Sequence, residues 1–184
     1  MKVLVISDSH GNSAPIRMLL DRYKDEVQTV VHLGNYDFEL IKFQPEYPSL
    51  NFVVVAGNGD YGLNSPKEQI LTIGDFVTRR VLLLHGHNHN VNNNINRLMY
   101  YALEKEVDAC LFGHTHIPYL CVHEPVFFGG ETERLVESGA TQKPRSCLIM
   151  NPGSVSQPRG GSNTGYGILT IDNEGNISGE LLEL

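Results

Sequence analysis

Short apolar runs alternate with polar segments along most of the chain. Seven of these runs are rich in Val, Ile and Leu and are bounded by Gly, Asn or Asp, as is typical of buried β-strands. The runs are residues 3–6, 29–33, 52–56, 81–84, 110–112, 147–150 and 167–171. Because helical segments lie between some of them, the pattern predicts a mostly parallel central sheet in an α/β or α+β layered fold.

Two segments carry apolar residues at helical spacing. Asn12 or Ser13 is placed to cap the first helix. Its apolar face comprises Ile16, Leu19, Leu20 and Tyr23. The second helix presents Ile95, Leu98, Met99, Ala102 and Leu103 on one face.

Residues 123–146 break this rhythm, because they are polar and rich in turn residues and include Phe127 and Phe128. We interpret them as a long excursion, such as a hairpin, from a single domain that spans residues 1–184. An excursion of this kind is either a tolerated insertion or a lid or partner surface.

Five of the apolar runs are followed directly by residues that can bind a metal. They are Asp8 and His10, Asn35 and Asp37, Asn58 and Asp60, His85, and His114 and His116. Ligands of open α/β sheets bind outside the carboxyl ends of the strands, so we expect these loops to converge on one rim. In extended segments alternate side chains point the same way, which would pair Asp8 with His10 and His114 with His116. Glycines at 34, 57, 86 and 113 would let the chain turn tightly.

Mixed carboxylate, imidazole and amide donors suit Mn, Fe, Zn, Ni or Co better than Ca or Mg. Acidic residues outnumber basic ones by 21 to 14, giving a net charge of -7. This balance argues against a broad nucleic-acid surface or an anionic membrane surface. The three cysteines form no Cys-x-x-Cys pair and are expected to be reduced and buried. The N-terminal apolar run is too short for a signal peptide, which favours a cytoplasmic location.

The segments "SDSHG", "GNGD", "HGH" and "GHTH", in that order, resemble the motifs of the calcineurin-like metallophosphoesterase superfamily. The chain length and the later "NPGSVSQPRGG" resemble its small bacterial and archaeal phosphodiesterase branch. The resemblance covers roughly residues 1–122 and 147–184. It implies a four-layer sandwich of two mixed β-sheets flanked by helices. It also implies a centre of two divalent metal ions, commonly manganese, that hydrolyses phosphoesters with a metal-bound hydroxide.

Carried onto this sequence, the resemblance assigns two sets of ligands. Asp8, His10 and His116 match the ligands of the first metal. Asn58, His85 and His114 match those of the second, and position 35 matches the bridging ligand. Asn58 and His85 would also take part in catalysis. The implied substrate is a small phosphoester. The resemblance leaves open whether the chain forms a homo-oligomer.

Two positions depart from the pattern of the active family members. Most of these have Asp at the bridging position, whereas this chain has Asn35. An amide carries no charge to offset two dications, so we expect weaker binding of the second metal. Larger members place a His, the proposed general acid, where Gly59 stands here. Asp60 is a candidate to assist catalysis or a turn residue, and Asp37 is a candidate extra carboxylate or a cap.

Other residues near the rim are candidates for substrate contact. His87, Ser154 and Arg159 could reach phosphate oxygens, although each is equally compatible with an ordinary loop residue. The small subunit of the retromer coat, which has the same fold, also has Asn after the Gly of its second motif. The alternative is therefore a catalytically weak or inactive scaffold that binds protein, and an apolar patch around Phe127 and Phe128 would favour it.

Overall fold

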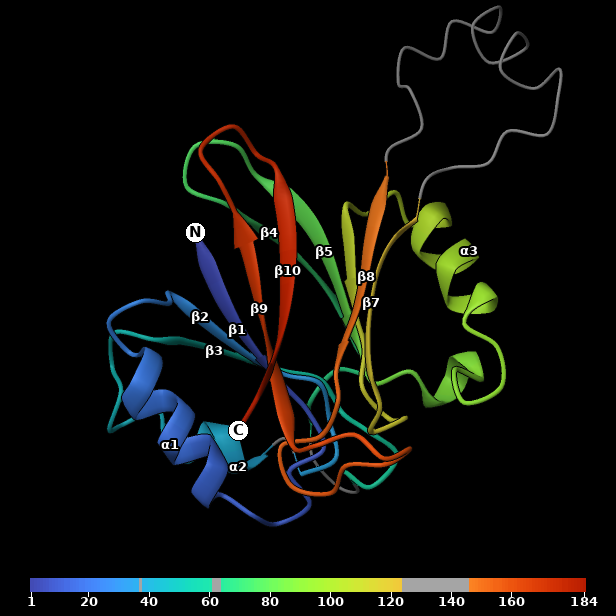
Figure 1. Ribbon diagram of the computed structural model, residues 1–184. Helices are drawn as coiled ribbons and strands as arrows, with labels where there is room; N and C mark the ends of the chain where they lie inside the picture. The colour runs from blue at the N-terminus through green and yellow to red at the C-terminus, as the bar shows by residue number, and fades with distance from the viewer. Residues whose placement is uncertain (37, 61–63, 124–145) are drawn as a thin grey trace, which may run out of the picture.

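Two five-stranded sheets form the centre of the protein (Figure 1) in a computed structural model that describes residues 1–36, 38–60, 64–123 and 146–184. The first sheet has the order β10 (Ile177–Glu183), β9 (Gly165–Ile171), β1 (Lys2–Ile6), β2 (Thr29–His32) and β3 (Asn51–Val54). The second has the order β4 (Glu68–Ile73), β5 (Arg79–Leu84), β6 (Ala109–Leu111), β8 (Cys147–Pro152) and β7 (Pro118–His123). Strands β1, β2 and β3 are parallel, as are β5, β6 and β8, and the other pairings are antiparallel. Both sheets are therefore mixed.

Helices cover the outer faces of the two sheets. Helix α1 (Ala14–Tyr23) and the short α2 (Phe38–Ile41) pack on the first sheet, and α3 (Asn96–Glu104) packs on the second (Figure 1). A 3₁₀ turn, η1 (His87–His89), precedes α3. The order helix, sheet, sheet, helix is the four-layer sandwich that the resemblance implied.

A continuous apolar layer holds the two sheets together. Val5 and Val31 of the first sheet share one buried cluster with Leu83 and Leu111 of the second, and each is 0% exposed. Burying a side chain of this size fully contributes about 1.5–3 kcal/mol. Because the carboxyl ends of β1, β2, β5 and β6 lie at the same end of this layer, their following loops meet at one rim (Figure 1).

All seven predicted strands and both predicted helices are confirmed, and the apolar face of α1 is buried as expected. The cap of α1 is Ser13, but its side chain makes no capping bond, and Asn12 Oδ1 instead accepts from the Ala14 N–H at 3.3 Å. The expectation of a single, mostly parallel central sheet is wrong, because two mixed sheets form. Cys110 and Cys147 are buried, but Cys121 on β7 is partly exposed, and all three are free.

The sequence pattern missed strands β4, β7 and β10 and the four-residue α2. All three strands are sheet edges, and their residues alternate between exposed and half-buried. A search for continuous apolar runs finds strands buried on both faces and passes over such edges. The predicted excursion at 123–146, with Phe127 and Phe128, lies almost wholly outside the described residues. No helix in the described part of the chain is long and apolar enough to cross a membrane.

Candidate metal centre

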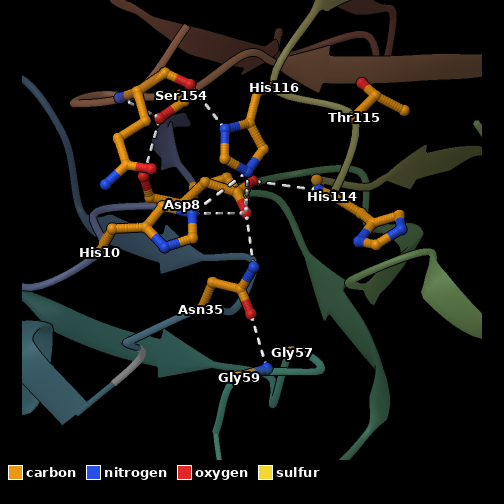
Figure 2. A network of polar contacts seen from close by, with 12 residues as sticks. Asp8, His10, Asn35, Gly57, Gly59, His114, Thr115, His116 and Ser154 are labelled. Carbon is orange, nitrogen blue, oxygen red and sulfur yellow. Dashed lines mark hydrogen bonds and ion pairs between the residues drawn. The ribbon is translucent and has the colours of Figure 1, made fainter. Parts of the chain in front are cut away.

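Asp8, His10 and His116 form a compact ligand group at the rim (Figure 2). One donor atom from each lies within 4.8 Å of the others. Asp8 Oδ1 is 3.2 Å from His116 Nε2 and 3.8 Å from His10 Nε2, and the two imidazole Nε2 atoms are 3.1 Å apart. Asp8 and His116 are buried, whereas the His10 side chain is 21% exposed. The group therefore opens to solvent on the His10 side.

The backbone that presents these ligands is not extended. Asp8, His10, Asn35, His114 and His116 all have positive φ, between 49° and 71°, where non-glycine residues are uncommon. The expectation that alternate side chains of extended segments would pair is therefore wrong for His114, which faces a different group from His116. Backbone conformations of this kind cost roughly 1–3 kcal/mol each and cluster at functional sites.

The glycines of these loops serve two purposes. Gly34 and Gly86 have φ of 98° and 103°, so they make the predicted tight turns. Gly57 and Gly113 instead allow close approach between loops. A Cβ on Gly113 would lie 2.1 Å from Ser7 Oγ, and one on Gly57 would lie 2.5 Å from the backbone nitrogen of Asn35.

The Asp8 carboxylate contacts residues from several loops of the rim. Its Oδ2 accepts hydrogen bonds from Ser7 Oγ at 2.6 Å and from the His114 N–H at 3.1 Å. Burial by itself raises the pKa of the Asp8 carboxyl. The close contact with His116, the nearby His85 and the Ser7 hydroxyl together outweigh burial and lower the pKa to about 2. The carboxylate therefore keeps its negative charge at neutral pH.

Asn58, His85 and His114 form a second ligand group. Asn58 Oδ1 lies 3.0 Å from His85 Nε2 and 3.0 Å from His114 Nδ1. His85 is fully buried, and its Nε2 is 3.9 Å from Asp8 Oδ1. The two groups are therefore neighbours, but this second group contains no carboxylate. Burial lowers the pKa of both His85 and His114, which favours their neutral, ligand-competent forms.

Backbone carbonyls fix the tautomers of the two buried histidines. His116 Nδ1 lies 2.6 Å from the Gln157 carbonyl oxygen, and His85 Nδ1 lies 2.7 Å from that of Leu33. A carbonyl only accepts, so each Nδ1 carries the proton, as in metal-ligating histidines. The free Nε2 lone pairs then point at Asp8 Oδ1 and Asn58 Oδ1 respectively, which are also electron-rich. A cation between such atoms removes the conflict, so both donor sets fit a divalent metal ion.

Asn35 lies between Asp8 of the first group and Gly59, with its amide held in one orientation (Figure 2). Its Oδ1 accepts from the Gly59 N–H at 2.8 Å, and its Nδ2 donates to Asp8 Oδ1 at 3.0 Å. Because a backbone N–H can only donate, the oxygen must face Gly59 and the NH₂ must face Asp8. An NH₂ group has no lone pair to give a metal, so this orientation does not fit a bridging ligand.

Asp60 and Ser154 are engaged with the backbone. The carboxylate of Asp60 accepts from the N–H groups of Asn35, Tyr36 and Gly57, which ties together the loops after β2 and β3. Ser154 is buried, and its hydroxyl donates to the Asp8 carbonyl oxygen at 2.7 Å. Both side chains hold the rim in shape, and their predicted roles in catalysis and substrate contact stay predictions.

The other predicted residues lie around the rim. Arg159 is exposed, and its charge acts on His10 and His114. The His87 ring lies 5.5 Å from that of His85 and 6.2 Å from that of His114. Asp37 is outside the described residues.

Four supporting residues were not predicted from the sequence, and of these only Ser9 lies within a quoted motif, "SDSHG". His32, Ser9 and Glu39 form a buried chain in which Ser9 Oγ lies 3.1 Å from His32 Nε2 and donates to Glu39 Oε2 at 2.6 Å. This chain links the loop after β1 to α2. Asn92 Nδ2 lies 2.9 Å from His114 Nε2. The only sequence signal for Asn92 was its place in the asparagine-rich segment after "HGHNHN".

Comparisons with known proteins agree with this geometry. Residues 1–174 match the family model of the calcineurin-like phosphoesterase superfamily domain. The probable metallophosphoesterase YsnB of Bacillus subtilis is 31% identical over 175 residues, which cover 95% of this chain and 86% of YsnB. A predicted phosphoesterase from Streptococcus pneumoniae superposes with a TM-score of 0.70 at 29% identity, covering 99% of this chain and 88% of that one.

A further solved structure shares the fold alone. Vps29 from Entamoeba histolytica, complexed with zinc, has a TM-score of 0.63 at 24% identity, with 99% of this chain and 98% of that chain covered.

Proposed function

This chain belongs to the calcineurin-like phosphoesterase superfamily, and from that premise we propose that it is a metal-dependent phosphoesterase that prefers diesters. The observation that carries the proposal is the convergence of Asp8, His10 and His116 within 4.8 Å, beside the second group of Asn58, His85 and His114. Divalent transition metals bound to these groups would activate water and neutralise charge on the phosphoryl oxygens.

The chain's own residues prepare the centre for this chemistry. Asp8 supplies the negative charge, and its pKa of about 2 keeps it ionised. The Gln157 and Leu33 carbonyls hold the Nε2 atoms of His116 and His85 as lone-pair donors. These donors suit Mn, Fe, Zn, Ni or Co, and the family resemblance favours manganese among them.

We propose that the two metals bind with unequal affinity. The first group has one carboxylate, whereas the second has only neutral donors. A metal in both groups also requires the Asn35 amide to turn, which breaks its bond from the Gly59 N–H, or to stay out of the coordination. We therefore expect the second ion to bind more weakly and turnover to be modest.

The preference for good leaving groups follows from the loop at residues 57–60. Gly59 offers no side chain to protonate a leaving group, and three backbone N–H groups occupy the Asp60 carboxylate. A general acid contributes typically about 10²–10⁴-fold. Without one, esters whose leaving oxygen departs as a stable anion are favoured. Arg159, whose charge acts on His10, and His87, whose ring lies 5.5 Å from that of His85, are our candidates to contact phosphate oxygens.

An assay of an aryl phosphodiester, bis(p-nitrophenyl) phosphate, tests the proposal. We expect hydrolysis with added Mn²⁺, loss of hydrolysis with a chelator, and loss in His85→Ala and His114→Ala. His123→Ala is the matched control, because His123 lies at the end of β7 remote from the rim. The absence of Mn²⁺-dependent turnover in the wild-type protein would contradict the proposal.

A second candidate is a scaffold that binds protein and turns over little or no substrate. The orientation of Asn35 favours it, as do the exposed apolar side chains of Ile117, just before β7, and of Leu120 and Val122 on β7. Metal binding alone does not separate an enzyme from a scaffold, because the same two ligand groups would hold a metal in either case. Turnover decides between them, since a scaffold would bind metal without hydrolysing the diester.

A further inference from the structure

Tyr36 is an exposed aromatic residue directly beside the first ligand group. Its ring centroid lies 5.9 Å from that of His10, and the residue is 39% exposed. The other large aromatic residues exposed in the described part of the chain are Phe76 and Tyr100, and they lie in the β4–β5 turn and on α3. Of these three rings, the Tyr36 ring is therefore the one beside a predicted metal ligand.

The backbone of Tyr36 is anchored on both sides in an uncommon conformation. Its φ is 74°, a region that non-glycine residues rarely adopt. The Tyr36 N–H donates to Asp60 Oδ1, and its carbonyl oxygen accepts from the Glu39 N–H at 3.2 Å. These bonds fix the direction in which the side chain leaves the loop. The ring is thus restricted to the rotamers about one fixed Cα–Cβ bond.

The neighbours of the Tyr36 ring suit a planar, anionic ligand. The ring lies over Gly11, where an added Cβ would be 3.9 Å from Tyr36 Cε1, so no side chain of residue 11 covers it. Phe38 lies 5.9 Å away between ring centroids, and Lys42 Nζ lies 4.4 Å from the Phe38 ring centroid. Aromatic surface and positive charge therefore adjoin on this side of the rim.

We propose that Tyr36 determines substrate specificity by stacking on an aromatic group attached to the phosphate. The proposal rests on the proposed function, because the phosphate must be bound at Asp8, His10 and His116. The substrate class is then a phosphoester with a ring close to phosphorus, either an aryl ester or a nucleotide. Exposed tyrosine beside a phosphate site recognises the face of a ring and tolerates differences at its edge.

Binding of matched analogues to the Mn²⁺-loaded protein, measured by calorimetry, tests this. The difference in affinity between phenylphosphonate and methylphosphonate measures recognition of an aryl group. The difference between adenosine 5′-monophosphate and ribose 5-phosphate measures recognition of a nucleobase. We expect the wild-type protein to prefer the ring-bearing member of at least one pair. Tyr36→Leu should weaken binding of that member by about 5- to 100-fold and leave its partner unchanged.

Two control variants separate the ring from other effects. Tyr36→Phe keeps the ring and should keep the preference. Tyr100→Leu removes an exposed tyrosine, 68% exposed on α3, and should change nothing. The proposal is overturned if the wild-type protein shows no preference in either pair, or if Tyr36→Leu weakens both members equally. If the protein prefers ring-bearing analogues but does not hydrolyse the diester, only the proposed activity is contradicted. If it hydrolyses the diester but shows no preference for ring-bearing analogues, only the role of Tyr36 is contradicted.

Discussion

The two ligand groups of the rim differ in charge although they hold the same number of side chains. The first contains the Asp8 carboxylate with His10 and His116, and the second contains the Asn58 amide with His85 and His114. Each group contains two imidazoles, so the two groups differ by one negative charge. At 4 Å, unit charges interact by about 4 kcal/mol at an effective dielectric constant of 20. One carboxylate is therefore enough to give the first group the higher expected affinity for a divalent metal.

The groups also differ in how firmly their ligands are held. His116 and His85 are buried, and a carbonyl fixes each ring. His114 is only half-buried, and an exposed amide, Asn92, contacts its outer nitrogen. Outer partners orient metal ligands, so His114 is the less constrained of the three. The second group thus combines a missing charge with a looser ligand.

Removing one histidine from either group should have the largest effect on the difference in metal affinity between the two groups. We expect His116→Ala to lower the affinity of the tight site by on the order of 100-fold or more, beyond the loss typical of an outer partner. His114→Ala should leave that site intact and abolish only the weak one. Titration calorimetry with Mn²⁺ measures both sites, and melting of the metal-free proteins checks that each variant folds. Equal losses at both sites in the two variants would show that the groups act as one unit.

Asn35→Asp should reduce the difference in metal affinity between the two groups. One carboxylate oxygen can still accept from the Gly59 N–H, while the other supplies charge where the amide NH₂ now stands. We expect tighter binding of the second metal, by about 10- to 100-fold, and faster diester turnover. Without metal, the new carboxylate would lie against Asp8 and lower the melting temperature.

Asn35→Ala is the matched control, because it removes the amide without adding charge. If Asn35→Asp changes neither the metal content, measured by elemental analysis, nor the melting temperature of the metal-free protein, the amide is not what separates the two groups.

The sequence predicted those parts of the fold that are buried on both faces. Continuous apolar runs such as 81–84 and 147–150 predicted strands that are nearly fully enclosed. Edge strands such as β4 and β10 gave no such run, because only one of their faces is covered. The division into two sheets was likewise not available from strand periodicity, and only the family resemblance implied it. Pairing partners depend on contacts between distant segments, which a local pattern does not contain.

At the site, the sequence predicted which residues meet but not how they are oriented. Loop motifs brought Asp8, His10 and His116 together as expected. The direction of the Asn35 amide depends on the Gly59 N–H, 24 residues away, and no rule of spacing reports it. The positive φ of His114 and His116 was hidden for the same reason, because tertiary contacts impose it against local preference.

Substitution of Asn92 should have the smallest effect on the difference in metal affinity between the groups. A metal on His114 Nδ1 would leave the ring proton on Nε2, and the Asn92 amide would have to turn its oxygen toward that proton to accept it. Asn92→Ala removes this partner, and because the contact is exposed we expect at most about a tenfold loss of second-site affinity. The tight site should not change, since in the described part of the chain the Asn92 amide contacts His114 and neither Asp8 nor His116. Asn93→Ala is the matched control, because the Asn93 amide bonds to Asn90 and not to a histidine. Calorimetry with Mn²⁺ measures the change, and an equal loss in both variants would trace it to the loop as a whole. A selective loss in Asn92→Ala would show that orientation of His114, and not charge alone, contributes to the weakness of the second group.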